Sequence, residues 1–530
     1  MLLGHNLIGF NTSASGPETL QSFSTIKGDF LPEKFYVATE EEVSAAVNKS
    51  VSAFKSYSKT DFVSRALFLE TIADQIYAIG DVLLGRANLE TGLPLLRLTG
   101  ERDRTVNQLK MFASLLREGS WADAVIDTAM PDRKPLARAD LRRMSHPLGP
   151  VVIFSASNFP FAFSTAGGDT ASALAAGCPV IIKAHSSHLG TNELIGKAII
   201  AAAKLTGMPD GIFSSLNGGG ATLGQRLARD TAVKAIGFTG SYRAGMALFN
   251  AATQHRKEPI PVYAEMSSIN PVIFLPDTLT EKTVQTATQI AGSISLGVGQ
   301  FCTNPGLLFV LRNHASETFI NALGESLSAI PPGVMLNTTI CQSYYKDRRK
   351  ISHAKGVEAV YAGTDASDQY KASTTLYKVD AADFITQPEL QDEVFGPCSM
   401  VVICNNQHEL EAALDSLHGQ LTGSVFGNEE EVQLFHSAID ILQQKVGRII
   451  FNAVPTGVEV CHAMVHGGPF PATTDSRTTS VGTEAIRRFV RPVCYQDCPQ
   501  LLLPVYLRDA NETGIMRKLN GVLSREPVSK

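Results

Sequence analysis

Between residues 150 and 265, short apolar runs alternate with stretches rich in small residues, and this alternation constrains the fold more than any other feature. The apolar runs are VVIFS from Val151, PVIIKA from Pro179, GIFSSL from Gly211, VKAIGF from Val233 and PVYAEM from Pro261. Intervening stretches such as TAGGDTASALAAG and ELIGKAIIAAAKL predict helices. Because such alternation is typical of a parallel sheet covered on both faces, we predict an α/β unit with ligands at the carboxyl ends of its strands.

A second alternation of the same kind follows residue 306. Its predicted strands are LLFVLR from Leu307, MVVIC from Met400, TGSVFG from Thr422 and RIIFNA from Arg448, with helical segments between them. At 530 residues the chain is long enough for two or three domains. Outside both units, ARADLRRMSHP and RRFVRPVCYQ indicate polar-faced strands, which commonly pair with another subunit or pack across domains.

Cys302 lies near the seam between these two units, in the stretch GVGQFCTNPG. This stretch is too rich in glycine for a helix, and its Asn-Pro step argues against a central strand. A structural cysteine usually lies inside an apolar run, where it behaves as a small hydrophobe. Here backbone amides can converge on whatever the thiol binds, so Cys302 is a candidate nucleophile.

The remaining cysteines and the overall charge exclude several classes of protein. Eight cysteines are too sparse for a disulfide scaffold, none forms a C-x-x-C pair, and the densest group, Cys461 with His462 and His466, has no fourth ligand at a workable spacing. We therefore expect no metal site. The net charge of −5 is not clustered, which argues against nucleic-acid and membrane partners. Without a signal-like start or an apolar run of bilayer length, a cytoplasmic location is expected.

Two stretches of the first unit predict a ligand site. In AIGFTGSYRAG, a strand leads through Gly240 to Gly245 and into a helix whose first amides could face a phosphate. LNGGGATLG, at residues 216 to 224, fits a nucleotide-binding turn and a simple strand-to-helix turn equally well. Lys183 ends the strand PVIIK and would point into the ligand crevice, unless it is an ordinary solvated lysine.

Six stretches in order resemble the aldehyde dehydrogenase superfamily over essentially the whole chain. They are SASNFPF, IIKAHSS, GFTGSYRAG, YAEMSSINP, GQFCTNPG and DEVFGPC. Within that family, GQFCTNPG, GVEVCHAMVHGGPFPAT and RPVCYQDCP are similar to the branch of 2,5-dioxovalerate (α-ketoglutarate semialdehyde) dehydrogenases that use NADP. A related branch with similar stretches oxidises long-chain aldehydes.

The resemblance implies three catalytic residues. Cys302 would attack the aldehyde, the side-chain amide of Asn158 and a backbone amide would stabilise the oxyanion, and Glu265 would activate water to hydrolyse the thioester. Taken without the resemblance, Asn158 fits a turn residue and Glu265 a surface carboxylate. The family's common ELGGK is EMSSI here, so Ser267 and Ser268 replace two glycines and the local backbone conformation is in question.

The resemblance also implies a cofactor site in a variant Rossmann lobe. Lys183 would bind the adenosine ribose, Gly240 and Ser241 would lie by the pyrophosphate, and Gly245 would support the turn. Glu393 would hold the nicotinamide ribose, with Phe395 packing nearby. Where relatives that prefer NAD commonly carry a glutamate, this chain has Ser186, and we therefore expect a preference for NADP, with NAD possible as an alternative cofactor.

The expected organisation is an aldehyde dehydrogenase fold, built from a variant Rossmann cofactor domain, an α/β catalytic domain and a small β element for oligomerisation. The boundaries expected are 1–133 and 148–265 for the NADP-binding domain, 266–480 for the catalytic domain, and 134–147 with 481–530 for the oligomerisation strands and C-terminal tail. The resemblance implies a homodimer or homotetramer.

The substrate is expected to be a small ω-semialdehyde bearing a carboxylate, oxidised to the acid. Phe159, Arg104 and Gln108 are candidate substrate contacts, although an exposed helical arginine is the commoner outcome for Arg104. Alternatives are a broad-specificity or long-chain aldehyde dehydrogenase, a CoA-acylating enzyme, and a catalytically silent protein on this fold. Glu265 argues against the acylating enzyme, which needs no hydrolytic base.

Overall fold

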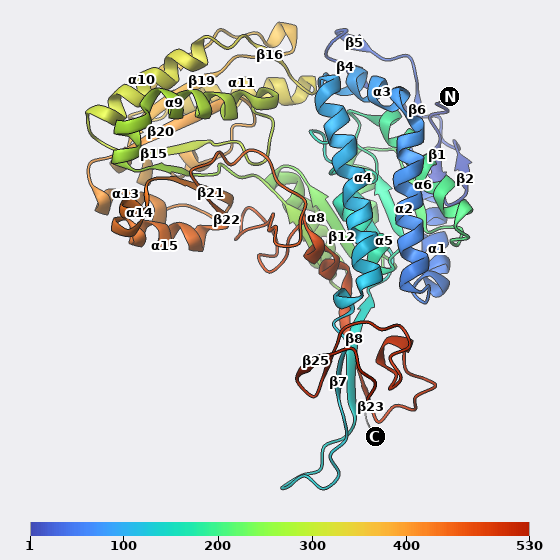
Figure 1. Cartoon of the computed structure of the whole chain (residues 1–530). Helices are drawn as coiled ribbons and strands as arrows, with labels where there is room; N and C mark the ends of the chain where they lie inside the picture. The colour runs from blue at the N-terminus through green and yellow to red at the C-terminus, as the bar shows by residue number, and fades with distance from the viewer. Residues whose placement is uncertain (1, 529–530) are drawn as a thin grey trace.

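Two seven-stranded sheets form the two larger units of the molecule, and a five-stranded sheet projects away from them (Figure 1). The structure is a computed structural model and describes residues 2–528. Among these residues, no helix has both the length and the apolar character needed to cross a bilayer.

The first sheet contains the five strands expected from the alternation between residues 150 and 265, and that prediction is confirmed. Its order is β13-β12-β9-β10-β11-β1-β2. The parallel strands are β9 (Val151–Phe154), β10 (Val180–Lys183), β11 (Phe213–Leu216), β12 (Ala235–Thr239) and β13 (Val262–Glu265), extended by antiparallel β1 (Asn6–Ile8) and β2 (Asn11–Ser13). The strand order reverses beside β9, which is where α/β sheets open a ligand crevice.

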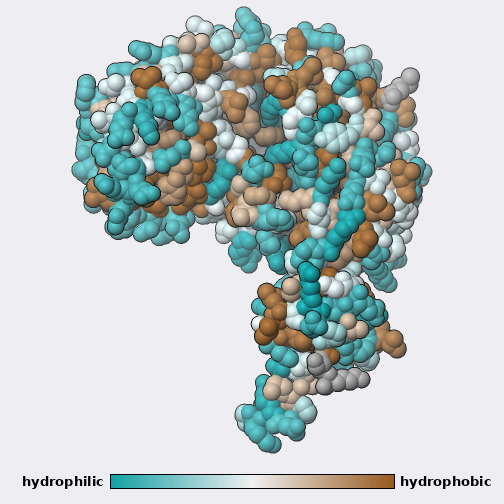
Figure 2. All heavy atoms as spheres, in the orientation of Figure 1, coloured by the Kyte–Doolittle hydropathy of each residue, from teal (hydrophilic) through white to brown (hydrophobic). Residues whose placement is uncertain are grey.

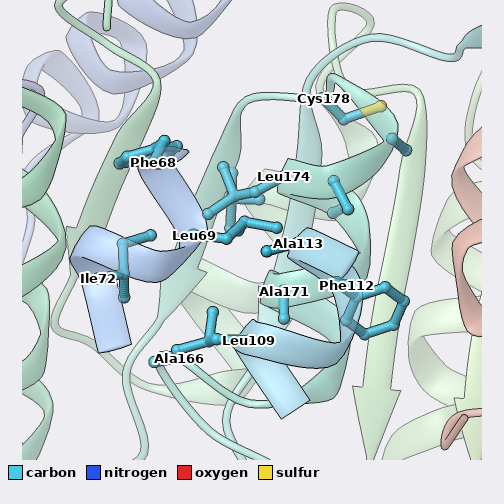
Figure 3. Close-up of a cluster of buried hydrophobic side chains, with 14 of the residues drawn as sticks. Phe68, Leu69, Ile72, Leu109, Phe112, Ala113, Ala166, Ala171, Leu174 and Cys178 are labelled. Carbon is cyan, nitrogen blue, oxygen red and sulfur yellow. The ribbon is translucent and has the colours of Figure 1, made fainter. Parts of the chain in front are cut away.

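The helices of this unit are α1 (Glu40–Tyr57), α2 (Phe62–Ile79), α3 (Asp81–Thr91), α4 (Leu95–Glu118), α5 (Gly168–Ala176), α6 (Leu189–Leu205), α7 (Gln225–Arg229) and α8 (Tyr242–Thr253). Figure 3 shows their packing, in which Leu109 and Phe112 of α4 lie with Leu69 of α2 and Leu174 of α5. All four side chains are fully buried. Because this apolar face fixes α4 against its neighbours, the position of Arg104 on the same helix is fixed as well.

The second sheet has the order β17-β19-β20-β15-β14-β21-β22. The four predicted strands are present as β15 (Leu307–Leu311), β20 (Cys398–Cys404), β21 (Gln420–Phe426) and β22 (Val446–Phe451). Three further strands, β14 (Val272–Phe274), β17 (Glu358–Ala362) and β19 (Thr375–Asp380), were not predicted. Its helices are α9 (Pro276–Ser295), α10 (His314–Ser328), α11 (Thr338–Ser352), α12 (Ala381–Ile385), α13 (Gln407–Asp415), α14 (Glu429–Leu434) and α15 (His436–Lys445).

The projecting sheet has the order β23-β8-β7-β24-β25. The polar-faced segments expected before Leu148 and near the C-terminus are β8 (Leu141–Pro147) and β23 (Val490–Gln496), and they pair with each other. The other members are β7 (Val125–Asp127), β24 (Arg517–Leu519) and β25 (Val522–Ser524). The domain boundaries stay a prediction; β7, which precedes the boundary expected at residue 133, lies in this sheet.

The surface of the projecting element carries hydrophobic side chains (Figure 2), among them Leu501 and Leu502, which are 88% and 73% exposed. The remaining strands form two-stranded sheets: β3 (Thr19–Leu20) with β6 (Phe35–Tyr36), β4 (Phe23–Ser24) with β5 (Asp29–Phe30), and β16 (Gly333–Val334) with β18 (Lys371–Ala372).

Candidate active site

Cys302 lies in a loop between α9 and β15, and glycine is required just before it. Gly299 has a φ of +63°, in the left-handed region, and a Cβ atom there would lie 2.3 Å from the carbonyl carbon of Gly396. The cysteine loop therefore packs directly against the loop that carries Glu393 and Phe395. This close approach brings two segments together that are almost a hundred residues apart in the sequence.

Asn270 clamps the cysteine loop from the other side. Its Nδ2 donates hydrogen bonds to the carbonyl oxygens of Cys302 (2.8 Å) and Asn304 (2.9 Å). Its own Oδ1 accepts from Ser268 Oγ at 2.8 Å. The serine that replaces a family glycine at residue 268 thus orients the clamp, and Asn270 itself takes a left-handed backbone with a φ of 46°.

Glu265, at the end of β13, meets Cys302 and His466 in one buried cluster. The Oε1 atom of Glu265 lies 3.0 Å from His466 Nε2, and its Oε2 accepts from Ser480 Oγ at 2.9 Å. His466 Nε2 in turn lies 3.5 Å from Cys302 Sγ. Glu265 and His466 are only 3% and 1% exposed.

The charges in this cluster fix its resting protonation. Burial alone would raise the pKa of Glu265, but the His466 imidazole and the hydrogen bonds from His466, Cys302 and Ser480 outweigh burial and bring that pKa below its ordinary value. Burial and the neighbouring Glu265 carboxylate raise the pKa of the Cys302 thiol well above its usual range. At neutral pH the cluster therefore holds a protonated thiol beside a carboxylate that can accept its proton.

Asn158 lies beside the cysteine loop, directly after β9. It is buried, and its Nδ2 donates to the Gln300 carbonyl oxygen at 3.0 Å. An amide group carries two N–H donors, so one remains for a ligand. Among residues 2–528, no group accepts a hydrogen bond from the backbone N–H of Cys302. The site thus offers two free N–H donors on the cysteine loop and beside it.

Aromatic rings and two arginines surround the approach to Cys302. Phe159 makes edge contacts with Phe163 and Phe301, at centroid distances of 5.3 and 5.5 Å. The Arg97 guanidinium lies 4.9 Å from the ring centroids of both Phe159 and Phe301, and that of Arg104 lies 5.2 Å from the ring centroid of Phe163. Phe159 is therefore part of a cluster of aromatic rings and arginines.

Within this cluster of rings and arginines, Arg104 has buried nitrogen atoms without hydrogen-bond partners. Its Nε and Nη2 atoms are buried and have no hydrogen-bond partner among residues 2–528. Burial lowers its pKa, against the opposing effect of Glu101, whose Oε1 is already taken by the backbone N–H groups of Phe161 and Ala162. Gln108 Nε2 is also buried without a partner, but it packs beside Gly168 of α5.

On the cofactor side, Lys183 ends β10 with its side chain 8% exposed. Burial lowers the pKa of its amine to about 8, and within the described part of the chain no carboxylate counteracts that shift. Ser186, three residues later, is exposed. Arg226, in α7 of the same unit, forms ion pairs with Glu40 and Asp230, both at 2.8 Å.

The predicted phosphate-binding turn lies at the start of α8, after β12. Ser241 caps this helix by accepting from the backbone N–H of Ala244, and residues 240 to 244 are exposed. A Cβ atom on Gly245 would lie 2.7 Å from Met266 Sδ. Gly245 therefore lets the helix approach the segment that follows Glu265, which is the supporting position expected for it.

Glu393 and Phe395 line a cleft together with Phe301 and Asn304. Burial raises the pKa of Glu393 to about 7, and the hydroxyl of Ser267 and the backbone of Ser268 oppose the shift. With a pKa of about 7, the carboxyl group of Glu393 is only partly ionised at neutral pH, and it lies beside the cysteine loop. It differs from Glu265, which has three donors of its own.

Sequence reasoning missed His466, Ser480 and Asn270 as members of this site. His466 had been considered only as a metal ligand with Cys461 and His462, and its true neighbours come from other elements of the fold. The ligand atoms of Glu265, Cys302 and His466 lie within 4.8 Å of one another. The contacts of His466 with the other two groups account for this proximity.

Comparison with known proteins identifies the family. The profile of the aldehyde dehydrogenase family matches residues 12–485. The chain belongs to this family, as its six ordered stretches predicted.

Two relatives match almost end to end. The chain is 48% identical to alpha-ketoglutaric semialdehyde dehydrogenase 2 of Azospirillum brasilense, over 98% of this chain and 99% of that protein. It is 44% identical to alpha-ketoglutaric semialdehyde dehydrogenase of Acinetobacter baylyi, with the same coverage.

Among solved structures, 1-pyrroline-5-carboxylate dehydrogenase from Thermus with bound NAD has a TM-score of 0.76 at 19% identity, covering 93% of this chain and 92% of that one. Betaine aldehyde dehydrogenase from Staphylococcus aureus has a TM-score of 0.78 at 20% identity, covering 94% and 97%. These likenesses confirm the predicted fold.

Proposed function

We propose that this protein is a non-acylating, NADP-preferring dehydrogenase that oxidises 2,5-dioxopentanoate (α-ketoglutarate semialdehyde) to 2-oxoglutarate. The observation that carries the choice of substrate is Arg104, a half-buried arginine with two buried, unpartnered nitrogen atoms, which interacts electrostatically with Cys302. The names of the two relatives that match almost end to end support the same substrate.

The reaction begins with Cys302. Its thiol passes a proton to the Glu265 carboxylate, and the thiolate attacks the aldehyde carbon. The oxygen of the aldehyde then carries the negative charge, which the free N–H of Asn158 and the backbone N–H of Cys302 stabilise. The nicotinamide ring, when bound, accepts the hydrogen of the aldehyde carbon as hydride.

Glu265 acts again in the second half of the reaction. Loss of the hydride leaves a thioester on Cys302, which water must hydrolyse. Glu265, after releasing its first proton to solvent, takes a proton from that water, which attacks the thioester carbon and frees the thiolate. Its lowered pKa keeps it ionised for this step at neutral pH.

Arg104 is the proposed anchor of the substrate carboxylate. A guanidinium can bind a carboxylate through two parallel N–H donors, and an unpaired buried arginine gains most from such a partner. Phe159 and Phe163 would enclose the short carbon chain between Arg104 and Cys302. Gln108 is a weaker candidate, because it packs beside Gly168.

The cofactor proposal rests on whether the residues present suit NADP. Lys183 is a buried amine without a carboxylate partner, and Ser186 is an exposed hydroxyl three residues later. A phosphate on the adenosine ribose would supply the missing negative charge, and nothing acidic replaces Ser186. Gly240 and Ser241 would lie by the pyrophosphate, with Gly245 supporting the turn. Glu393 would hold the nicotinamide ribose, with Phe395 packing nearby.

A homo-oligomer, either a dimer or a tetramer, is proposed through the projecting sheet. β23 is an edge strand of that sheet, with unpaired backbone groups along one side. Exposed leucines at residues 501 and 502 lie in the same element. Sedimentation analysis of the full chain would measure the oligomeric state.

The test is a panel of aldehydes ranked by kcat/KM with NADP and with NAD. We expect 2,5-dioxopentanoate to exceed pentanal, which lacks the carboxylate, by at least about tenfold. Each assay is repeated with coenzyme A, which should leave the rate unchanged. A preference for long, uncharged aldehydes would contradict the substrate proposal, and a requirement for coenzyme A would contradict hydrolysis by Glu265.

A further inference from the structure

His466 lies between Cys302 and Glu265, which carry out the proton transfers of the proposed reaction. That reaction gives His466 itself no role. Its Nε2 atom is 3.0 Å from Glu265 Oε1 and 3.5 Å from Cys302 Sγ. The ring is almost completely buried, and its other nitrogen, Nδ1, has no hydrogen-bond partner among residues 2–528. Both functional contacts of the ring are therefore made by one atom.

The hydrogen-bond network assigns the proton on this ring. Since an ionised carboxylate only accepts hydrogen bonds, the contact with Glu265 requires Nε2 to carry a hydrogen. Nδ1 faces no hydrogen-bond partner among residues 2–528, so the ring reaches the two reacting groups through Nε2 alone. One N–H is thus available, and two atoms that alternately carry negative charge lie within its reach.

We propose that His466 is a catalytic residue that shares one N–H between the two reacting groups. It donates to the Glu265 carboxylate while Cys302 is a thiol, and it donates to the Cys302 thiolate once the proton has moved to Glu265. This inference rests on the proposed roles of Cys302 and Glu265, and it adds a third group to them.

The proton transfer balances without any further reactant. The S–H bond of Cys302 breaks, an O–H bond forms on Glu265, and the negative charge moves from the carboxylate to the sulfur. The hydrogen bond from His466 follows the charge, so the buried anion has a donor before and after the transfer. A buried anion without a donor would be costly, which is why a shared donor eases the transfer.

The segment at residues 479 and 480 holds His466 in this position. The backbone N–H of His466 donates to Thr479 Oγ1 at 2.8 Å, and its carbonyl oxygen accepts from the backbone N–H of Ser480 at the same distance. Ser480 Oγ also donates to Glu265. One short segment therefore positions both the imidazole and the carboxylate, which favours a preorganised site.

Other charged groups face the thiol but do not replace His466. Arg104 and Arg448 act on Cys302 electrostatically, and Glu393 opposes them. Among residues 2–528, no other side-chain N–H group lies within hydrogen-bond distance of Sγ. His466 is therefore the donor that can stabilise the thiolate directly.

The experiment compares His466→Phe, which keeps a ring of similar size without an N–H, with His466→Gln, whose amide can place an N–H near the position of Nε2. His462→Phe is the matched control, because His462 lies on the same loop but is exposed. The readout is the rate at which iodoacetamide alkylates Cys302, measured from pH 4 to pH 10 without substrate or cofactor and assigned by peptide mass spectrometry. The pH profile of kcat/KM is recorded in parallel.

We expect His466 to stabilise the Cys302–Glu265 pair while it carries one negative charge, whether that charge lies on the carboxylate or on the sulfur. His466→Phe should shift the acidic limb of both profiles upward by at least about one pH unit, so that the loss of rate is large at the acidic end of the range and small at pH 9. His466→Gln should recover most of the shift, and His462→Phe should show none. Circular dichroism checks the fold, and His466→Met replaces the Phe variant if that protein is unfolded.

Two outcomes would overturn the proposal. In the first, the acidic limb of the folded Phe or Met variant stays where it is in the wild type. In the second, the Gln variant matches the Phe variant, so that the N–H is not what matters. Alkylation at another cysteine in place of Cys302 would instead contradict the proposed nucleophile, which keeps the two failures distinguishable.

Discussion

Glu265 and the two cations Arg104 and Lys183 differ in whether the protein itself provides a partner for the charge. Glu265 has donors from His466 and Ser480 within 3.0 Å, and its pKa falls below the ordinary value despite burial. Lys183 is also buried and Arg104 is half-buried, but neither has a charged partner in hydrogen-bond contact among residues 2–528. The Glu265 cluster therefore contains hydrogen-bond partners for its own charge, whereas Arg104 and Lys183 lack charged partners among the described residues.

This difference separates what the protein supplies from what a ligand must supply. A buried charge without a partner is costly, and the lowered pKa of Lys183 records that cost. A carboxylate beside Arg104 and a phosphate beside Lys183 would provide the missing charge. The cluster around Glu265, by contrast, needs no ligand to set its protonation. Substitutions in the two regions should therefore fail in different ways.

The largest effect is expected inside the partnered cluster. Cys302→Ala removes the atom that forms the covalent bond, so NADPH production should fall to background while the fold and cofactor binding remain. Cys494→Ala, at an exposed cysteine of the projecting sheet, is the control and should retain activity. Turnover by the Cys302→Ala protein at the wild-type rate would remove Cys302 from the reaction.

Glu265→Gln should slow steady turnover by about 10² to 10⁴-fold, the range for loss of a general base. Glu265 serves both halves of the reaction, and an acyl-enzyme should accumulate on Cys302 to the extent that hydrolysis is slowed more than acylation. Intact-protein mass spectrometry after addition of aldehyde and NADP detects this adduct. If turnover stays fast and no adduct forms, another group must activate the water.

The parallel sheet and the cysteine loop could be predicted from local sequence, and the partnered cluster could not. Continuous apolar runs such as VVIFS specify buried strands wherever they occur, and Lys183 at the end of one such run is placed by strand direction alone. The strands that were missed are shorter or less apolar: β14 has only three residues, and β17 is mostly exposed. Their pairing is decided by neighbouring strands and not by their own pattern.

His466 was missed because its role depends on contacts across the whole chain. It lies 201 residues from Glu265 and 164 residues from Cys302 in the sequence. Nothing in VEVCHAMVHGG distinguishes the buried His466 from the exposed His462 four residues before it. Asn270 is similar, because the clamp it forms exists only when the cysteine loop packs beside it.

At the margin of the cluster, Arg104→Met should lower kcat/KM for 2,5-dioxopentanoate by about 10- to 100-fold, the range for a lost hydrogen bond to a charged group. The rate for pentanal should change far less, because that aldehyde has no carboxylate to bind. Arg102→Met, on the same helix beside Asp103, is the control and should affect neither substrate. An equal loss for both aldehydes would mean that Arg104 supports the pocket without binding a carboxylate.

A smaller change is expected from Ser186→Glu. The new carboxylate would oppose the 2′-phosphate of NADP at short range and could accept hydrogen bonds from the ribose hydroxyls of NAD. The ratio of kcat/KM values for the two cofactors should move toward NAD by at least about tenfold, or 1.4 kcal/mol. Thr288→Glu, at an exposed residue of α9 in the second unit, is the control for a general change in surface charge. An unmoved ratio would show that Ser186 does not face the adenosine ribose.

The smallest effect is a pH dependence of NADP binding that originates in Lys183. In the free protein the pKa of this amine is lowered to about 8, and a phosphate beside it would raise that pKa. The favourable charge is therefore present below pH 8 and is lost as the pH rises through that value. With half of the amine ionised near pH 8, the affinity for NADP should weaken by about fourfold between pH 7 and pH 8.5. NAD, which lacks the phosphate, should bind with little change over the same interval. Isothermal titration calorimetry measures both cofactors on the wild type and on Lys183→Met, in which the pH dependence of NADP binding should disappear. A wild-type affinity for NADP that is constant up to pH 9 would mean that Lys183 does not meet the phosphate as a titrating amine.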